Sequence, residues 1–219
     1  SEQVEYVNTQ FSGIKLRLLK DHSLWSHVLF NASKLCQQLI KNNTINVNGM
    51  SVLELGSGSG IVSIQCIISD ASRVVVNDYP DQEITDNLLF NVQQNLPFQR
   101  DDCTFVSQRQ KIQVSTYFWG RSCFKYQFDV ILICDCIQVI NQQENLIKEL
   151  QVNLKENGEC FVVYQHHELK KVEKVEEFFG KLTKNGFIVK TLQTVQMGVQ
   201  FEEDEKFEGQ EFVHCKVVR

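Results

Sequence analysis

The stretch Ser51-Val-Leu-Glu-Leu-Gly-Ser-Gly-Ser-Gly-Ile-Val-Ser-Ile64 decides the fold of this chain. It begins as an apolar run typical of a buried strand, passes through glycines at 56, 58 and 60, and continues as an apolar helical pattern. A strand, a glycine-rich turn and a helix start form the nucleotide-binding corner of a doubly wound α/β sheet. Glycine lets the backbone approach a ligand closely, and the helix start offers free N–H groups to a carboxylate or phosphate.

The spacing of the glycines argues against a dinucleotide as the ligand. The fingerprint G-x-G-x-x-G would place its third glycine at position 61, which is occupied by Ile61. The next apolar run, residues 74–76, ends at Asn77 and Asp78, about 20 residues after the glycine turn, where a ribose-binding carboxylate belongs. Asp81 beside Pro80 is the better helix cap, so we interpret Asp78 as a ligand-binding carboxylate.

Composition and charge restrict the classes of protein to consider. The chain has 219 residues, of which 42% are hydrophobic, enough for the core of one domain. The net charge of −5 argues against a nucleic-acid partner, because nucleic-acid-binding proteins usually carry basic patches. No apolar run approaches the ~20 residues of a membrane span, and residues 1–5 lack the pattern of a signal peptide.

The eight cysteines are scattered and include no C-x-x-C pair. Several lie in apolar patterns, as buried free thiols do. We therefore expect no disulfide framework and no metal site, and we expect the protein to work in the reducing cytoplasm.

The remaining chain alternates between strand and helix patterns. This alternation, followed by two final strands, predicts an α/β fold with a mostly parallel twisted sheet, helices on both faces and a C-terminal antiparallel hairpin. Residues 1–48 are expected to be an N-terminal extension packed on a core domain of residues 49–219. Expected helices cover 24–40 (capped by Ser23), 61–69, 81–94, 141–154 (opened by a capping box at Asn141) and 169–184; expected strands lie within 1–22 and over 52–55, 73–78, 112–118, 128–134, 159–164, 187–194 and 211–218, and 103–106 is left as a strand or an insertion.

The form E-x-G-x-G-x-G, from Glu54 to Gly60, resembles motif I of the S-adenosylmethionine-dependent methyltransferases with the Rossmann-like seven-stranded fold. Further matches make the chain resemble methyltransferase family 16, the group of protein-lysine and nicotinamide-N-methyltransferase-like enzymes. These matches are Trp25 before motif I, Asp78 at the second strand end, Trp119-Gly120, and Cys134-Asp135 where the family commonly has Ala-Asp.

This resemblance implies S-adenosylmethionine as the cofactor and assigns residues to its site. The implied cofactor-binding residues are Trp25, Glu54, Gly56, Ser57, Gly58, Asp78, Trp119 and Cys134. Ordinary core packing remains the alternative reading of the two tryptophans. Asp135 is the catalytic candidate, because it follows a buried central strand at the edge where open α/β sheets bind ligands, and its carboxylate could orient an amine or accept its proton. A strand-end carboxylate that caps a loop is the alternative reading of Asp135.

Two segments resemble one branch of the family more closely. Asp78-Tyr-Pro-Asp81 and Tyr164-Gln-His-His167 are similar to the branch that methylates translation elongation factor 1-alpha. The resemblance implies a protein substrate, with a translation factor as one candidate. His166 and His167 follow a strand at the active edge and are read either as lining a substrate pocket or as solvated loop residues.

One position departs from the family pattern. Lysine methyltransferases of the family usually follow the catalytic-site Asp with D-x-x-Y or D-x-x-F, whereas this chain reads Asp135-Cys-Ile-Gln138. Gln138 offers an amide in place of an aromatic wall. Either the substrate differs, or a neighbour such as Tyr164 supplies the ring, or activity is lost. No proline follows Asp135, which disfavours a nucleic-acid base as substrate.

We therefore expect an N-methyltransferase that acts on a protein amine, either a lysine side chain or an N-terminal α-amine. Methylation of a small-molecule amine and a catalytically silent S-adenosylmethionine-binding module remain the alternatives. A dehydrogenase is the least favoured, because of Ile61. The sequence does not fix the oligomeric state, and we expect a monomer.

Overall fold

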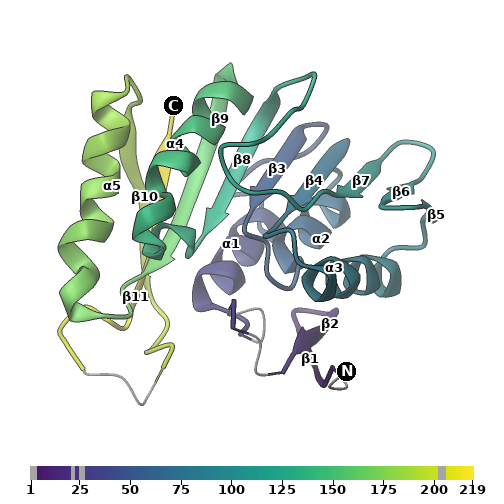
Figure 1. Cartoon of the computed structure of the whole chain (residues 1–219), viewed down its shortest axis with the longest axis horizontal. Coiled ribbons are helices and arrows are strands. Elements are labelled where there is room, and N and C mark those ends of the chain that lie inside the picture. The colour runs from purple at the N-terminus through teal and green to yellow at the C-terminus, as the bar shows by residue number, and fades with distance from the viewer. Residues whose placement is uncertain (1–3, 21–22, 25–27, 202–205) are drawn as a thin grey trace.

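A computed structural model of the chain describes residues 4–20, 23–24, 28–201 and 206–219 (Figure 1). Its centre is a nine-stranded sheet in the order β10-β11-β9-β8-β3-β4-β7-β6-β5. The parallel strands are β3 (Ser51–Leu55), β4 (Arg73–Asn77), β7 (Lys111–Val114), β8 (Phe128–Cys134) and β9 (Leu154–Gln165). The antiparallel strands are β5 (Gln99–Asp101), β6 (Thr104–Val106), β10 (Val189–Gln196) and β11 (Phe212–Val218).

Helices cover both faces of this sheet, as the sequence predicts (Figure 1). One face carries α1 (Asn31–Lys41), α2 (Ile61–Ile68) and α3 (Gln82–Asn95). The other carries α4 (Gln143–Asn153) and α5 (Val172–Lys184), and a 3-10 turn (Leu169–Lys171) precedes α5. The predicted α/β fold with a C-terminal antiparallel hairpin is confirmed, and β5 with β6 adds a short hairpin at the far edge.

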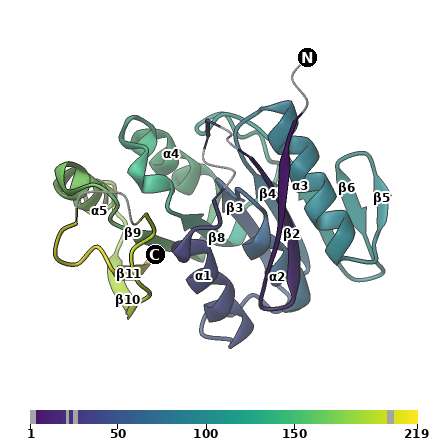
Figure 2. The ribbon, with the colours of Figure 1, turned by 90° about the horizontal axis from the view of Figure 1, so that it is seen from below.

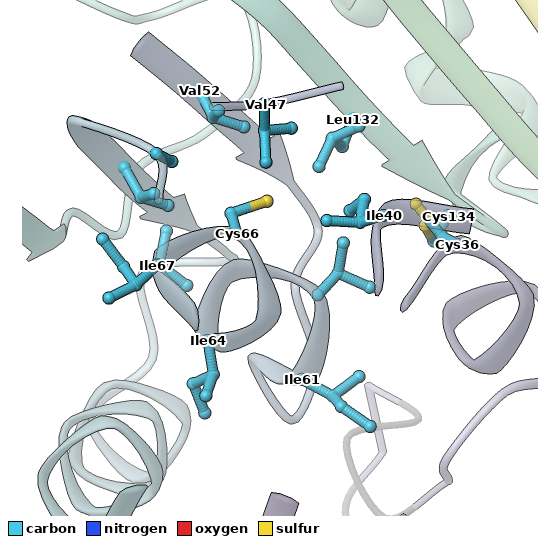
Figure 3. Close-up of a cluster of buried hydrophobic side chains, with 14 of the residues drawn as sticks. Cys36, Ile40, Val47, Val52, Ile61, Ile64, Cys66, Ile67, Leu132 and Cys134 are labelled. Atoms are coloured by element: carbon cyan, nitrogen blue, oxygen red, sulfur yellow. The ribbon is translucent and has the colours of Figure 1, made fainter. Parts of the chain in front are cut away.

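Two buried clusters fill the space between the sheet and its helices. Side chains alternate along a strand, so β8 sends Leu132 into the first cluster and Ile131 and Ile133 into the second. Figure 3 shows the first cluster, in which Cys36 of α1 lies beside Cys134 of β8. Because β8 is buried on both faces, its sequence is a continuous apolar run.

The N-terminal part of the chain packs on the first face. β1 (Tyr6–Phe11) and β2 (Ile14–Leu19) form a separate antiparallel pair, which lies against α3 and α2 (Figure 2). Leu16 is buried, and the carbonyl of Arg17 accepts hydrogen bonds from Asn87 and Asn91 of α3, each at 2.9 Å. The predicted short strands ahead of the main fold are therefore present.

Helix α1 begins later than the sequence predicts. Ser23 lies in a turn and does not cap a helix, and Phe30 is still extended, with φ −65° and ψ 145°. The backbone N–H of Asn31 donates to the side chain of Gln200 at 2.7 Å. A residue that is distant in the sequence therefore supplies the acceptor for the first N–H group of the helix. Trp25 lies outside the described residues, and its predicted role stays a prediction.

Three further boundaries differ from the prediction. β7 ends at Val114 instead of continuing to residue 118, although Ser115 N–H and Tyr117 N–H still donate to the carbonyls of Val76 and Asp78 (2.9 and 3.1 Å). Asn141 does not open α4: it lies in a 3-10 turn (Ile140–Gln142), and α4 has no side-chain cap. β9 begins directly after α4 and includes Gly158 instead of following it.

No helix among the described residues is long and apolar enough to cross a membrane.

Candidate active site

The carboxyl ends of neighbouring parallel strands bring the candidate residues to one edge of the sheet. The glycine turn follows β3, Asp78 follows β4 and Asp135 follows β8. Since β4, β3 and β8 are adjacent, these residues gather where open α/β sheets bind ligands.

The glycine turn leaves its backbone open on one side. Gly60 starts α2 in the left-handed conformation, with φ 77°. Gly56 has φ 69°, and a side chain there would meet the indole of Trp119 at 3.0 Å and the thiol of Cys136. Both observations require glycine. The turn can therefore bring backbone N–H groups close to a ligand, and Trp119 stands beside it.

Asp78 ties this turn to the end of β4. Its Oδ2 accepts a hydrogen bond from Gly58 N–H at 2.7 Å, and its Oδ1 accepts one from Tyr79 N–H at 2.7 Å. Asp81 is the cap of α3, where it accepts from Glu83 N–H and Ile84 N–H (2.8 and 3.2 Å), as the sequence predicts. Asp78 therefore fixes the glycine turn against the end of β4.

Glu54 lies beneath the turn as a buried cap of α2. Its Oε2 accepts from Ser63 N–H at 3.0 Å and from the Ser63 hydroxyl. Burial raises the pKa of this carboxyl to about 8. Among the described residues, its Oε1 and the Ser57 hydroxyl oxygen are buried without a hydrogen-bond partner. These two atoms are free to bind a polar group that enters the turn.

Asn77 fixes Trp119 at the site. The indole N–H of Trp119 donates to Asn77 Oδ1 at 3.0 Å. The Asn77 amide donates in turn to the carbonyls of Ser115 and Tyr117, at 3.1 and 3.3 Å. No motif assigns a role to Asn77, although an amide at the end of an otherwise apolar strand is a usable signal of one, and the residue is fully buried.

Glu149 of α4 holds the loop on the other side of Trp119. This buried carboxyl accepts hydrogen bonds from Gly120 N–H at 2.7 Å and from the Tyr117 hydroxyl at 3.2 Å. Burial next to Glu149 raises the pKa of Tyr117 well above its ordinary value. A cleft of about 760 Å³ lies between this loop and α4, and its lining does not include Asp78 or Asp135. Phe118, Trp119, Gly120, Arg121, Gln142, Asn145 and Lys148 line it.

Asp135 adopts a left-handed backbone conformation, with φ 57° and ψ 4°. Its Oδ1 accepts from Gln165 N–H at 2.9 Å, so one oxygen does cap the end of β9. Its Oδ2 lies 3.3 Å from Nε2 of His167. Neither of these atoms has an aligned hydrogen-bond partner in the described part of the chain. A strained, buried residue with an unused oxygen is typical of a functional site.

His166 and His167, which follow β9, are both mostly buried and have different neighbours. His167 faces Asp135, whereas Nε2 of His166 lies 3.3 Å from Glu176 of α5. The reading of both as solvated loop residues is therefore wrong. His166 lies away from Asp135, among Tyr164, His214 and Glu176.

Tyr164 does not supply a ring beside Asp135. It is only 1% exposed, its hydroxyl donates to Glu176 at 2.6 Å, and its ring packs on Phe179 and His214. The side-chain amide of Gln138 donates to the carbonyl of Gln165 and thereby holds the turn after Asp135 to β9. Cys134 turns its side chain into the first buried cluster. The predicted contacts of Tyr164, Gln138 and Cys134 with ligands stay predictions.

Within the described ranges, no three His, Cys, Asp or Glu side chains gather where they could hold a metal ion.

Residues 20–185 match the family model described as lysine methyltransferase. A protein N-terminal and lysine N-methyltransferase of Schizosaccharomyces pombe (efm7) is 32% identical over 203 residues, which cover 87% of this chain and 76% of that protein. A relative with the same description from Candida glabrata is 28% identical over 206 residues, covering 90% and 77%.

Solved structures agree in fold. A putative SAM-dependent methyltransferase from Streptococcus mutans superposes with a TM-score of 0.65 at 15% identity; the match covers this whole chain but only 57% of that longer one. TYW2 of Pyrococcus horikoshii, solved in complex with MeSAdo, gives a TM-score of 0.65 at 15% identity over 97% of this chain and 70% of that one. With the family match across most of its length and this methyltransferase fold, the chain belongs to the lysine methyltransferase family.

Proposed function

We propose that this protein transfers a methyl group from S-adenosylmethionine to an amine of a protein, either a lysine side chain or an N-terminal α-amine. The observation that carries the proposal is the meeting of the glycine turn, Asp78 and Asp135 at one sheet edge in a chain of this family. The curated relatives are described as methyltransferases for both kinds of amine.

The residues at the turn fit S-adenosylmethionine. No atom lies within 4 Å of the place where a side chain at Gly58 would begin, so the turn leaves room there for the cofactor, and the Asp78 carboxylate suits ribose hydroxyls. Glu54 Oε1 and the Ser57 hydroxyl are buried polar atoms that lack a partner within the described residues, and the amino and carboxylate groups of the cofactor can satisfy them. Trp119, held by Asn77, offers an aromatic face next to the turn.

When bound, S-adenosylmethionine would supply a methyl group on a positively charged sulfur. An uncharged amine would attack the methyl carbon in line, and the sulfur would leave as a neutral thioether. The task of the protein is then to orient the amine and to remove its proton. Oδ2 of Asp135 can accept a hydrogen bond from the amine, and Nε2 of His167 lies 3.3 Å from this oxygen. Asp135 is therefore our catalytic residue.

Methyl transfer to proteins tests this function directly. The purified chain is incubated with methyl-labelled S-adenosylmethionine and a protein extract, and an Asp135→Asn variant is run in parallel. We expect a labelled protein band that weakens about 100-fold or more in the variant, because proton removal and orientation are both impaired. Binding of S-adenosylmethionine without any labelled protein would contradict the proposal and favour a silent binding module.

The acceptor that we propose is translation elongation factor 1-alpha. The support is the resemblance of Asp78-Tyr-Pro-Asp81 and Tyr164-Gln-His-His167 to the branch that methylates this factor. We likewise propose that the protein acts as a monomer in the cytoplasm. Purified elongation factor 1-alpha that takes no label, while other extract proteins do, would contradict the choice of acceptor.

A further inference from the structure

Aromatic side chains gather on the α1 side of Asp135. The ring of His167 lies 5.8 Å from that of Phe30 and 5.4 Å from that of Phe201, measured between centroids. Phe30 and Phe201 themselves meet edge to face at 6.0 Å. Phe30 directly precedes α1, whereas Phe201 lies in the connection between β10 and β11. Rings from both ends of the chain thus surround the histidine that faces Asp135.

A set of buried amides holds these two segments together. The side chain of Gln165, at the end of β9, donates to the carbonyls of Gly198 and Gln210 at 2.7 and 2.6 Å. Its oxygen accepts from the side chain of Asn31 at 3.2 Å, and Gln200 accepts from Asn31 N–H at 2.7 Å. Asn31 Oδ1 in turn accepts from Lys34 at 3.3 Å. The positions of Phe30 and Phe201 are therefore fixed relative to β9 and to Asp135.

Two buried polar atoms face each other next to the rings. Oδ2 of Asp135 and Nε2 of His167 are 3.3 Å apart but are not aligned for a hydrogen bond with each other or with any other described residue. The side chain of Asp135 is 5% exposed. A buried carboxylate oxygen without a donor is costly, so a third group that carries N–H donors would be stabilised here.

We propose that Phe30, Phe201 and His167 form, together with Asp135, the binding site for the cationic amine of the acceptor and for its methylated product. This inference rests on the proposed function and assigns its acceptor site. It also explains how the chain does without an aromatic residue at Gln138: the rings come from the segment before α1 and from the β10–β11 connection. Gln138 and Tyr164 are engaged elsewhere, with Gln165 and Glu176.

The chemistry of this site suits an ammonium ion. The carboxylate of Asp135 supplies the opposite charge and accepts an N–H, while aromatic faces attract a cation without requiring a donor. Each added methyl group removes an N–H donor and leaves the positive charge, so the share of the binding that the two phenylalanine rings provide increases with methylation. A methylated ammonium is accordingly held by Phe30 and Phe201, and an unmethylated one mainly by Asp135.

A quaternary ammonium probe tests the site without any methyl transfer. The full chain is titrated with tetramethylammonium chloride and, separately, with neopentanol, an uncharged molecule of similar size, and binding is followed by ligand-observed NMR. The variants are Phe30→Leu and Phe201→Leu, which keep an apolar side chain but remove the ring. Phe90→Leu is the matched control, since Phe90 is an exposed ring on α3 that contacts Arg17. The thermal unfolding midpoint of each variant verifies that it is folded.

We expect tetramethylammonium to bind the wild type in preference to neopentanol, and each ring deletion to weaken its affinity about two- to fivefold. The same variants should raise KM for an acceptor protein and leave the Kd of S-adenosylmethionine unchanged, and Phe90→Leu should change neither. Equal affinities of Phe30→Leu, Phe201→Leu and the wild type for tetramethylammonium would overturn the inference, even if the wild type methylates protein. Failure of the proposed function would look different, because the wild type would then label no protein whatever the ring variants bind.

Discussion

Asp78 allows a direct test of the cofactor site by a single substitution, because its carboxylate accepts a hydrogen bond from Gly58 N–H at 2.7 Å. Asp78→Ala removes this charged hydrogen bond and the acceptors for a ribose. We expect the Kd of S-adenosylmethionine to rise about 10- to 150-fold, since a hydrogen bond to a charged group contributes about 1.5–3 kcal/mol. Titration calorimetry measures it, with Asp101→Ala on the exposed strand β5 as the control. An unchanged Kd would place the cofactor elsewhere.

Glu54 makes the stability of the protein depend on pH. Burial raises its pKa from 4.5 to about 8, so between these values the folded state binds more protons than the unfolded state. The free energy of unfolding therefore decreases as the pH rises through this window. Glu54→Gln does not titrate, so we expect its stability to fall less than that of the wild type from the lower to the upper end of the window.

Urea unfolding across this pH range measures the difference. Glu156→Gln, at an exposed position, is the control and should follow the wild type. Parallel pH profiles for the wild type and Glu54→Gln would show that Glu54 is already ionised in the folded protein.

At the residue scale, the sequence identified side chains that stand at strand ends. Glu54, Asp78 and Asp135 could be placed because parallel strands deliver their carboxyl ends to one edge. It could not identify Phe30 and Phe201, because these two rings are far apart in the sequence and meet only in the folded protein. The motifs also do not predict the hydrogen-bond donors of these carboxylates. Ser63 N–H donates to Glu54 and Gly58 N–H donates to Asp78 because of the geometry of the glycine turn.

At the element scale, Gln165 connects the end of β9 to the segments at both ends of the chain. Gln165→Leu leaves the buried carbonyl of Gln210 without its donor, and the Asn31 amide loses its acceptor on Gln165, while the Gly198 carbonyl keeps only the longer bond from Asn31 at 3.4 Å. We expect the free energy of unfolding to drop by about 2–4 kcal/mol, because each unsatisfied buried group costs about 1–3 kcal/mol. Gln127→Leu, which removes an exposed amide bond to Val152, is the control and should cost far less. Equal urea midpoints for both variants would contradict this account.

Helix α5 is joined to the sheet by Glu176. Although partial burial acts to raise its pKa, hydrogen bonds from His166, Lys216 and Tyr164 lower it to about 2. A depressed pKa contributes stability above the ordinary value of 4.5, and this stability is lost as the pH falls toward 2. We expect Glu176→Gln to be less stable than the wild type at neutral pH and to lose less stability on acidification.

Urea unfolding at neutral and acid pH tests the role of Glu176, and Glu177→Gln on the same helix is the control. A variant that loses as much stability on acidification as the wild type would show that Glu176 is not held ionised by these contacts.

The elements themselves were predictable to different degrees. The bounds of β8 follow from its apolar run, and α3 begins where Asp81 caps it. The start of α1 was misplaced, because Gln200 supplies a hydrogen bond that the local sequence does not encode. Periodicity determines the type of an element more firmly than its ends.

At the scale of the whole molecule, different parts of the chain build the two halves of the site. The stretch from β3 to α4 contains the glycine turn, Asp78, Trp119 and Asp135. Phe30 and Asn31 before α1 and the β10–β11 connection are held to the end of β9 through Gln165. Phe30 and Asn31 therefore join the N-terminal part of the chain to the acceptor site that we propose. The mostly parallel sheet with its C-terminal antiparallel hairpin could be predicted from the strand–helix alternation, whereas the contact between Phe30 and Phe201 could not.

The most direct test of the account measures which chemical group receives the methyl. A protein extract is divided, the amines of one half are blocked by acetylation, and both halves are incubated with the purified chain and labelled S-adenosylmethionine. We predict that label enters protein in the untreated half and is lost in the acetylated half. Label that survives acetylation, or no label in either half, would contradict the assignment of this chain as a protein amine methyltransferase.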